Sequence, residues 1–371
     1  MKISNTLLKK EEQATLALRE LYDKYGYTQY KMSKFEEYDL YVRNKNFLIS
    51  DSVITFTDTN GKLMALKPDV TLSIVKNTKD VPGYVQKVYY NENVYRVTEK
   101  THAFREIMQT GLECLGDIDD YCIAEVLSLA ASSLAEISED YILDVSHLGL
   151  LTHLIDSIGI PSDARGDLLE CVAQKNRHDV ARICAEAGVD AEKAQTLLCL
   201  MACSGEVTAT MKELYALLPD AAWQREVAQF DAVLSLLPTE HVRIDFSVIH
   251  DLSYYSGIVF QGFVEGVPEN ILSGGQYDNL MARMEKKSGA IGFALYLDRL
   301  EALVSPRKEY DVDALLLYGE NDSPAAILAA VQQLTEEGLC VLAQKSVPER
   351  LTYRQLFKFS ESGVQNVERN A

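Results

Sequence analysis

No stretch of this chain is apolar for long enough to cross a membrane, because a spanning helix needs about 18 consecutive apolar residues. The first residues, MKISNTLLKKEEQ, also lack the apolar centre of a secretion signal. We therefore expect a cytoplasmic protein that has no contact with a membrane.

Positive charge is scarce as well. The 371 residues include 36 Lys and Arg against 55 Asp and Glu, a formal net charge of −19. A chain this acidic repels the phosphates of nucleic acids unless its Lys and Arg gather on one face. The basic groups at Lys31–Lys34 and Lys286–Lys287 are small, so the charge balance weakens a role in nucleic-acid binding without excluding it.

Cysteine gives no sign of a metal site. There are seven cysteines, an odd number, and most of them stand in apolar segments with a helical pattern. Cys199 and Cys203 share one helix face, but no second Cys or His pair accompanies them. We interpret these side chains as small buried apolar groups.

The chain does contain a dense strand pattern between Arg243 and Arg299. Apolar and polar residues alternate from Ile244 to Val248 and again from Ile258 to Phe263. The pair Tyr254–Tyr255 stands between these runs, and Gly274–Gly275 follows where backbone must pass close to another group. Tyrosines and bare backbone around one concavity describe a pocket for a small polar ligand, although an ordinary antiparallel sheet core fits the pattern equally well.

Two local signals organise the N-terminal part. Apolar residues recur at helical spacing from Leu7 to Tyr25. The segment VITFTDTNGKLMALKPD predicts a hairpin, because Asn60-Gly61 tolerates the positive φ angles of a type I′ turn. In the later strand FREIMQTGLECLG, Gln109 and Glu113 point the same way, about 13 Å apart along the strand. Taken alone, such a pair is typical of a solvated sheet face.

The remaining chain suggests an insertion and a second domain. Strand signals vanish from about residue 160 to 237, which predicts an inserted helical subdomain. The polar segment SPRKEYD marks a boundary, so we predict a core over residues 1–308 and a short C-terminal unit over 309–371. In that unit, Ser323-Pro324 opens a helix between two strands, and a short tail follows.

Five motifs occur in order: KPDVT at Lys67, the Arg96–Glu113 region ending in QTGLE, HDLSYYSGIVF at His250, GGQYDNL at Gly274 and GFALYLDRL at Gly292. Together they resemble the catalytic core of class II aminoacyl-tRNA synthetases of the histidyl-tRNA synthetase type. The resemblance covers about residues 1–305 and, more loosely, the C-terminal unit. It implies an α+β fold with a six-stranded antiparallel sheet flanked by helices.

The resemblance also implies a histidine pocket. The matching residues are Asp69, Thr71, Arg96, Gln109, Glu113, Tyr254 and Tyr255. Asp69 stands where a Glu usually contacts the ligand ammonium, and the tyrosine pair stands around the imidazole. Carboxylates would offset the ammonium, and polar groups would satisfy a buried imidazole. In this context Gln109 and Glu113 become candidate pocket residues rather than a solvated face.

Four departures from the active synthetase pattern concern its chemistry. His250 replaces an arginine that helps adenylate formation, and a mostly neutral imidazole cannot supply a fixed bidentate cation. Lys67 replaces another arginine, and Ala103 stands where a basic residue is expected, in a loop one residue short of the pattern. The C-terminal unit is shorter than the anticodon-binding domain. Arg96 and Arg299 still match the ATP-binding arginines, so the loss is partial.

This combination resembles a paralogous branch, the regulatory subunits of ATP phosphoribosyltransferase. The resemblance implies a protein with no catalytic residues and no cofactor, which binds L-histidine and a short-form catalytic subunit in histidine biosynthesis. It also implies a homodimer within a hetero-oligomer, with the dimer contact in the region from Tyr27 to Phe47. The alternatives are a divergent active histidyl-tRNA synthetase, a paralogue that binds tRNA or makes an adenylate, and a folded relic without function.

Overall fold

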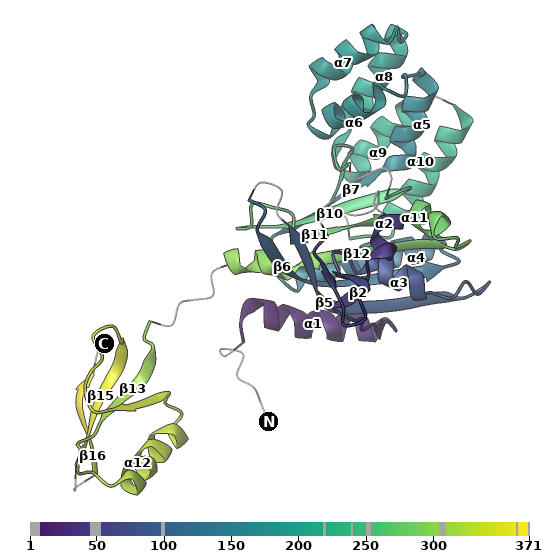
Figure 1. Ribbon diagram of the computed structural model, residues 1–371. Helices are drawn as coiled ribbons and strands as arrows, with labels where there is room; N and C mark the ends of the chain where they lie inside the picture. Colours follow the sequence, from purple (N-terminus) through teal and green to yellow (C-terminus); the bar gives the residue numbers. More distant parts are fainter. Residues whose placement is uncertain are drawn as a thin grey trace. The chain divides into compact units, whose positions relative to one another are not determined.

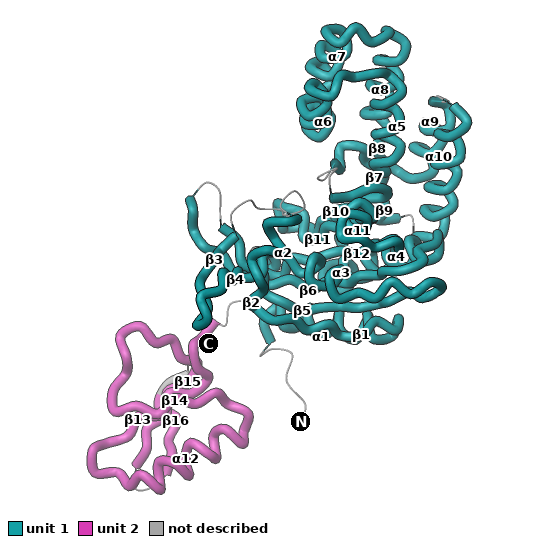
Figure 2. Tube along the Cα trace, turned by 45° about the vertical axis from the view of Figure 1, so that its right-hand side comes forward, with its two compact units in different colours: residues 1–303 teal, residues 304–371 magenta. Residues whose placement is uncertain are grey.

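The computed structural model describes residues 8–44, 53–97, 101–217, 220–238, 240–249, 254–303, 309–360 and 363–369. The chain forms two compact units, residues 1–303 and 304–371 (Figure 2). The first four residues of the polar segment SPRKEYD, where we expected the boundary, lie outside the described residues. No helix among the described residues is long and apolar enough to cross a membrane.

Unit 1 is built on a nine-stranded sheet with the order β1-β5-β6-β12-β11-β10-β7-β9-β8 (Figure 1). Its six middle strands are β5 (Val85–Val97), β6 (Phe104–Gly116), β12 (Gly289–Tyr296), β11 (Leu272–Gln276), β10 (Ile258–Val264) and β7 (Tyr141–His147). Each of them pairs antiparallel with its neighbours among the six. The predicted α+β fold with a large antiparallel sheet is therefore confirmed.

Short strands extend this sheet at both edges. β1 (Thr28–Gln29) pairs parallel to β5, and β9 (Val242–Asp245) pairs parallel to β7. β8 (Ser204–Glu206) closes the far edge beside β9. Because the edge strands are this short, they leave few unpaired backbone groups open to another chain.

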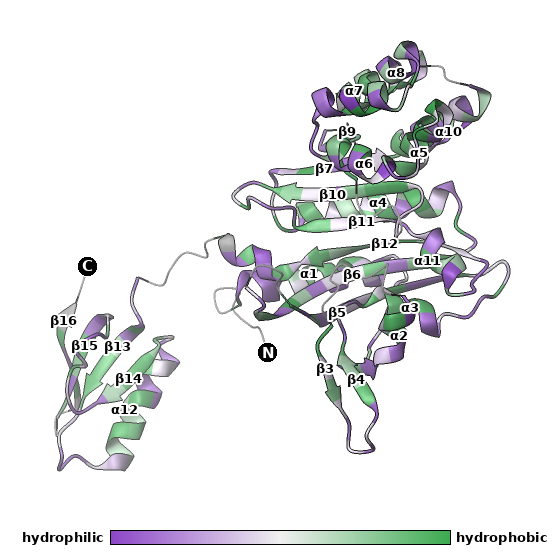
Figure 3. Ribbon diagram, turned by 45° about the horizontal axis from the view of Figure 1, so that its top comes forward, coloured by the Kyte–Doolittle hydropathy of each residue, from purple (hydrophilic) through white to green (hydrophobic). Residues whose placement is uncertain are grey.

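One face of the sheet packs against helices α1 (Lys10–Lys24) and α4 (Asp120–Ala135). Tyr22 of α1 lies against the rings of Tyr89 and Phe293, and its hydroxyl lies 3.0 Å from that of Ser133 on α4. β10, which is largely buried, is mostly hydrophobic along its length (Figure 3). Side chains alternate along a strand, so the neighbours of Tyr89 and Phe293 project from the opposite face. That opposite face carries the site.

A small three-stranded sheet, β2-β4-β3, adjoins the main one. It contains β2 (Phe35–Glu37), β3 (Thr55–Thr57) and β4 (Leu63–Leu66), followed by α2 (Tyr38–Arg43) after β2 and α3 (Thr71–Asn77) after β4. The predicted hairpin exists, but the prediction of a type I′ turn is wrong. Gly61 has a φ of 81°, whereas Asn60 keeps a negative φ. The Asp58 carboxylate accepts the N–H groups of Asn60 and Lys62, both at 2.8 Å, and stabilises this wider turn.

The helical insertion begins earlier than the sequence predicts. Its helices are α5 (Leu148–Ile158), α6 (Arg165–Ala173), α7 (Arg177–Glu186), α8 (Ala191–Ala202), α9 (Val207–Ala216) and α10 (Ala221–Leu234). α5 follows β7 directly, with the His147 ring accepting the N–H of Leu150 at 3.1 Å as its cap. The insertion also contains β8, a strand that the sequence did not reveal.

Unit 1 ends in a short helix. After α11 (Asp278–Arg283) and β12, the chain forms the 3₁₀ helix η3 (Leu297–Ala302). This tighter helix carries Asp298 and Arg299, directly after the last residue of β12. This placement brings both side chains to the face of the sheet opposite α1 and α4, which is called the polar face below.

Unit 2 is a four-stranded sheet with the order β14-β13-β15-β16 and one helix. Its elements are β13 (Val312–Leu317), α12 (Pro324–Glu336), β14 (Val341–Gln344), β15 (Tyr353–Ser360) and β16 (Gly363–Arg369). The predicted strand–helix–strand unit is confirmed, and β13 and β14 are parallel. The prediction of a short tail is wrong, because that segment forms β15 and β16. Phe357 of β15 joins Leu316 and Leu334 in the core.

Candidate functional site

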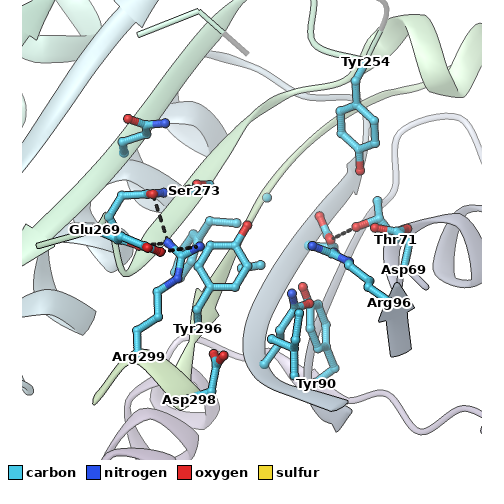
Figure 4. Close-up of a pocket in the computed structure, with 18 of the residues that line it drawn as sticks. Asp69, Thr71, Tyr90, Arg96, Tyr254, Glu269, Ser273, Tyr296, Asp298 and Arg299 are labelled. Carbon is cyan, nitrogen blue, oxygen red and sulfur yellow. Dashed lines mark hydrogen bonds and ion pairs between the residues drawn. The ribbon is translucent and has the colours of Figure 1, made fainter. Parts of the chain in front are cut away.

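A cavity of about 690 Å³ opens on the polar face of the main sheet. All seven residues that the sequence assigns to a histidine pocket line it: Asp69, Thr71, Arg96, Gln109, Glu113, Tyr254 and Tyr255. The cavity has two ends (Figure 4). The Asp69 end contains Asp69, Thr71 and Arg96, and the Arg299 end contains Arg299, Glu269 and Tyr296.

Glu113 is the central acidic group of the Asp69 end. It projects from β6, is 2% exposed, and accepts hydrogen bonds from the hydroxyls of Thr71 and Tyr277, each at 2.7 Å. Burial raises the pKa of Glu113 to about 8, and the charge of Asp69 adds to this effect. A carboxyl group held in this way suits a ligand that offers a cation or an N–H group.

Gly292 makes room for the Glu113 side chain. It lies on β12 directly opposite Glu113 on β6. A Cβ at position 292 would collide with the Glu113 carboxylate and would lie 2.5 Å from the carbonyl oxygen of Leu112. Glycine is therefore required here by space, not by backbone angle.

Asp69 supplies the second carboxylate. It is 8% exposed, and its Oδ1 accepts the N–H of Leu72 at 2.8 Å, in the first turn of α3. Burial raises the pKa of Asp69, while the Leu72 N–H and the Arg96 charge oppose the rise. Arg96 also donates its Nε–H to the carbonyl of Pro68 at 3.1 Å, which ties the KPDVT segment to β5.

Arg96 and Arg105 face each other across β5 and β6 as direct cross-strand partners. Like charges in this position repel each other. Within the described parts of the chain, neither guanidinium has a carboxylate oxygen within 4.0 Å. The pair is therefore suited to a small anion such as a carboxylate.

Gln109 is buried at 3% exposure, and its Nε2 has no hydrogen-bond partner among the described residues. A buried donor without a partner costs about 1–3 kcal/mol. This cost is removed when a ligand oxygen accepts the N–H. Gln109 and Glu113 thus lie on one buried strand face, and the solvated face that the pair suggests on its own is wrong.

Tyrosines enclose the Asp69 end. The ring centroid of Tyr254 lies 4.6 Å from that of Tyr255 and 5.9 Å from that of Tyr277. The sequence reasoning missed the roles of Tyr277 and Tyr90, although Tyr277 belongs to the GGQYDNL motif. Tyr90 depends on Gly111, where a Cβ would lie 2.6 Å from the Tyr90 hydroxyl.

Two of the residues that depart from the synthetase pattern, Lys67 and Ala103, lie within the described residues. The Lys67 side chain is 1% exposed and forms a partly buried ion pair with Glu92, and it does not line the cavity. Ala103 is exposed just before β6. His250 lies outside the described residues. The same holds for residues 98–100 of the loop after Arg96 and for residues 45–47 of the expected dimer region.

At the other end of the cavity, Arg299 is held by its own neighbours. Its Nη1 donates to the backbone oxygen of Asn270 and, at 3.0 Å, to Asn270 Oδ1. Its Nη2 lies 3.4 Å from Glu269 Oε2, and its guanidinium carbon lies 4.4 Å from the centre of the Tyr296 ring. Among the described residues, no group of three or more His, Cys, Asp or Glu side chains could hold a metal ion.

A family model described as Histidyl-tRNA synthetase matches residues 4–300. An ATP phosphoribosyltransferase regulatory subunit from Oceanobacillus iheyensis is 28% identical over 316 residues, covering 82% of this chain and 78% of the relative. A Histidine--tRNA ligase from Methanococcus maripaludis is 29% identical over 307 residues, covering 79% of this chain and 72% of the relative.

Two solved structures share the fold. An ATP phosphoribosyltransferase regulatory subunit/histidyl-tRNA synthetase from Bacillus halodurans superposes with a TM-score of 0.76 at 20% identity, over 96% of this chain and 99% of that one. A chain of the ATP phosphoribosyl transferase (HisG:HisZ) complex from Thermotoga maritima superposes with a TM-score of 0.60 at 18% identity, over 80% and 98%. The family match covers most of the chain, and this protein therefore belongs to the histidyl-tRNA synthetase family.

Proposed function

We propose that this chain is the non-catalytic regulatory subunit of an ATP phosphoribosyltransferase and that it binds free L-histidine at the Asp69 end of the cavity. The observation that carries the proposal is the convergence of two buried carboxyl groups, one unpartnered amide and several tyrosines on one cavity. The regulatory subunits among the relatives support the assignment to this branch of the family.

The charges of the Asp69 end are complementary to those of an amino acid. The ligand ammonium lies near Asp69 and Thr71, where a carboxylate offsets its charge. The ligand carboxylate accepts N–H groups from Arg96 and from Gln109 Nε2. The imidazole lies between the tyrosines, with one of its N–H groups directed at Glu113. The buried Gln109 Nε2 then has a partner, as burial requires.

We propose that the chain is not catalytic because the basic residues that the synthetase chemistry needs are replaced or already paired. Lys67 is committed to Glu92, away from the cavity, and Arg299 is committed to Glu269 and Asn270. Ala103 supplies no charge in the loop before β6. A transition state with developing negative charge on phosphate would lack several of the cations that stabilise it.

The partner is a short-form catalytic subunit, and histidine bound to this chain inhibits the activity of the complex. The Thermotoga maritima complex, whose chain shares this fold, supports such an assembly. We also propose a homodimer inside the hetero-oligomer, with the contact in the region from Tyr27 to Phe47. Histidine can act on the assembly only by binding its active and inhibited states with different affinity.

Isothermal titration calorimetry with L-histidine tests the proposed ligand. We expect saturable binding at one site per chain, with no binding of L-leucine, whose side chain offers Glu113 neither a cation nor an N–H group. Co-purification of the tagged chain with a catalytic subunit from the source cell tests the partner. If the chain binds neither histidine nor a catalytic subunit, the proposal is wrong.

The second candidate is a divergent active histidyl-tRNA synthetase. The observation that favours it is Arg96, which lines the cavity, together with the similarity to a Methanococcus maripaludis ligase. Charging of tRNA(His) with radiolabelled histidine separates the two functions. We expect no turnover, and a rate within tenfold of an ordinary synthetase would establish the ligase instead. A tRNA-binding paralogue would instead show binding with a steep salt dependence.

A further inference from the structure

The cavity has room for more than one amino acid. Its volume of about 690 Å³ falls within the roughly 300–1,000 Å³ of pockets that hold drug-sized ligands. Its charged lining consists of three arginines and four carboxyl groups: Arg96, Arg105, Arg299, Asp69, Glu113, Glu269 and Asp298.

The Arg299 guanidinium is fixed by a preformed set of acceptors. Nη1 donates to Asn270 twice, to its backbone oxygen and to its side-chain oxygen. The Asn270 amide is itself oriented, because its Nδ2 donates to Ser273 Oγ at 2.6 Å and to the Leu272 carbonyl at 3.3 Å. Tyr296 covers one face of the guanidinium. The arrangement leaves Arg299 few donors for an incoming anion.

Glu269 completes this arrangement with a charge. Its carboxylate lies 3.4 Å from Arg299 Nη2, and its side chain is 69% exposed while that of Arg299 is 28% exposed. Glu269 is thus the more exposed of the two side chains, and its carboxylate lies beside the guanidinium (Figure 4). An anion that approaches Arg299 from solvent therefore comes near Glu269 and is repelled by it.

We infer that Glu269 and Asn270 hold Arg299 as an internal ion pair, and that Glu269 thereby keeps polyphosphate ligands such as nucleotides out of the Arg299 end. Glu269 is thus a residue that determines the charge selectivity of the cavity. The inference deepens the proposed function, on which it rests in placing a single amino acid at the Asp69 end. Arg96, which has no carboxylate within 4.0 Å among the described residues, still donates to the one carboxylate of that ligand.

Calorimetry with ATP and with inorganic pyrophosphate tests this selectivity on the full chain. The variants are Glu269→Gln, which removes the charge, and Glu269→Lys, which reverses it. Glu265→Gln and Glu265→Lys are the matched controls, because Glu265 lies four residues earlier, is exposed and does not line the cavity. Exposed charge pairs contribute about 0.2–1 kcal/mol, so Glu269→Gln should lower the dissociation constant for ATP roughly two- to fivefold. Glu269→Lys should lower it further.

Both gains should shrink at high salt, because the charges are exposed to solvent. The control variants should leave ATP and pyrophosphate binding unchanged at the same salt concentration. Equal gains in ATP affinity at positions 265 and 269 would show an effect of net charge alone and overturn the inference. Wild-type protein that binds ATP as tightly as Glu269→Lys does would also overturn it. Histidine titrations of the wild type and the same variants keep the two proposals apart, because a wild type that does not bind histidine would contradict the proposed function and leave the ATP comparison unaffected.

Discussion

The two ends of the cavity differ in how Arg299 and Gln109 are satisfied. At the Arg299 end, the guanidinium already has partners in Asn270 and Glu269. At the Asp69 end, buried polar atoms are incompletely matched: Gln109 Nε2 has no partner among the described residues, and burial raises the pKa of Glu113. Unsatisfied buried groups favour binding, whereas internally satisfied groups oppose it. The difference indicates that a ligand belongs at the Asp69 end.

The largest effect is expected from Gly292→Ala. The added Cβ would collide with the Glu113 carboxylate and with the Leu112 carbonyl, so either the strand pairing or the carboxylate must move. Overpacking of this kind costs about 1–3 kcal/mol of stability, and histidine binding should be lost as well. Gly166→Ala is the control, because its Cβ would meet nothing within 4 Å. Thermal unfolding and calorimetry measure both effects, and an unchanged histidine affinity in Gly292→Ala would contradict this account of the Glu113 site.

Glu113→Ala should come next. Removal of the carboxylate leaves a ligand donor and the hydroxyls of Thr71 and Tyr277 without an acceptor in a buried site. The expected loss is about 1–3 kcal/mol of histidine binding, or roughly five- to 150-fold in the dissociation constant. Glu106→Ala removes an exposed carboxylate from the same strand and should bind histidine normally. Equal affinity in Glu113→Ala and wild type would show that the pocket is misassigned.

A smaller effect concerns pH. The folded protein holds the Glu113 proton up to a pKa of about 8, well above the ordinary value of 4.5. Between these two pH values the folded protein therefore binds more protons than the unfolded chain. This contribution to stability is complete below about pH 4.5 and is lost as the pH rises toward 8. Asp144, with a pKa raised to about 6, acts in the same direction at lower pH.

His147 acts in the opposite direction, because burial lowers its pKa to about 4, and its contribution ends near pH 6.5. The window from about pH 6.5 to 8 therefore reports mainly on Glu113. In this window, urea unfolding should show the stability of the wild type falling with pH, and Glu113→Gln should show a flatter dependence. Parallel curves for the two proteins would mean that Glu113 is ionised in the folded state at neutral pH.

The smallest effect is expected at the other end of the cavity. Arg299→Gln removes a guanidinium that is already paired with Glu269 and Asn270, so histidine affinity should change less than about twofold. Calorimetry under the conditions used for Glu113→Ala measures the change. A tenfold loss in Arg299→Gln would remove the distinction between the two ends.

Much of the site could be predicted from local patterns. The alternation in FREIMQTGLECLG placed Gln109 and Glu113 on one face, and the motifs picked out seven residues that line one cavity. That these residues bind histidine stays a prediction. The Tyr277–Glu113 bond and the Asn270–Arg299 contact could not be predicted, because they join residues far apart in the chain through side-chain geometry.

Errors in the fold came from local signals that a neighbouring group overrides. Asn60-Gly61 predicts a type I′ turn, but the Asp58 carboxylate stabilises a different one. β15 and β16 carry many charged and amide side chains, and their pairing to each other and to β13 holds them as strands. β-propensity depends on such pairing and packing more than on the residues alone.

The most direct test of the account is histidine inhibition of the reconstituted complex. The short-form catalytic subunit is assayed with wild-type regulatory chain and with Glu113→Ala, across a range of L-histidine concentrations. Allosteric couplings of about 1–3 kcal/mol predict several-fold to hundredfold inhibition with the wild-type chain, and little inhibition with Glu113→Ala at the same histidine concentrations. If Glu113→Ala abolishes histidine binding to this chain but leaves inhibition of the complex unchanged, the effector site lies elsewhere and the central claim is wrong.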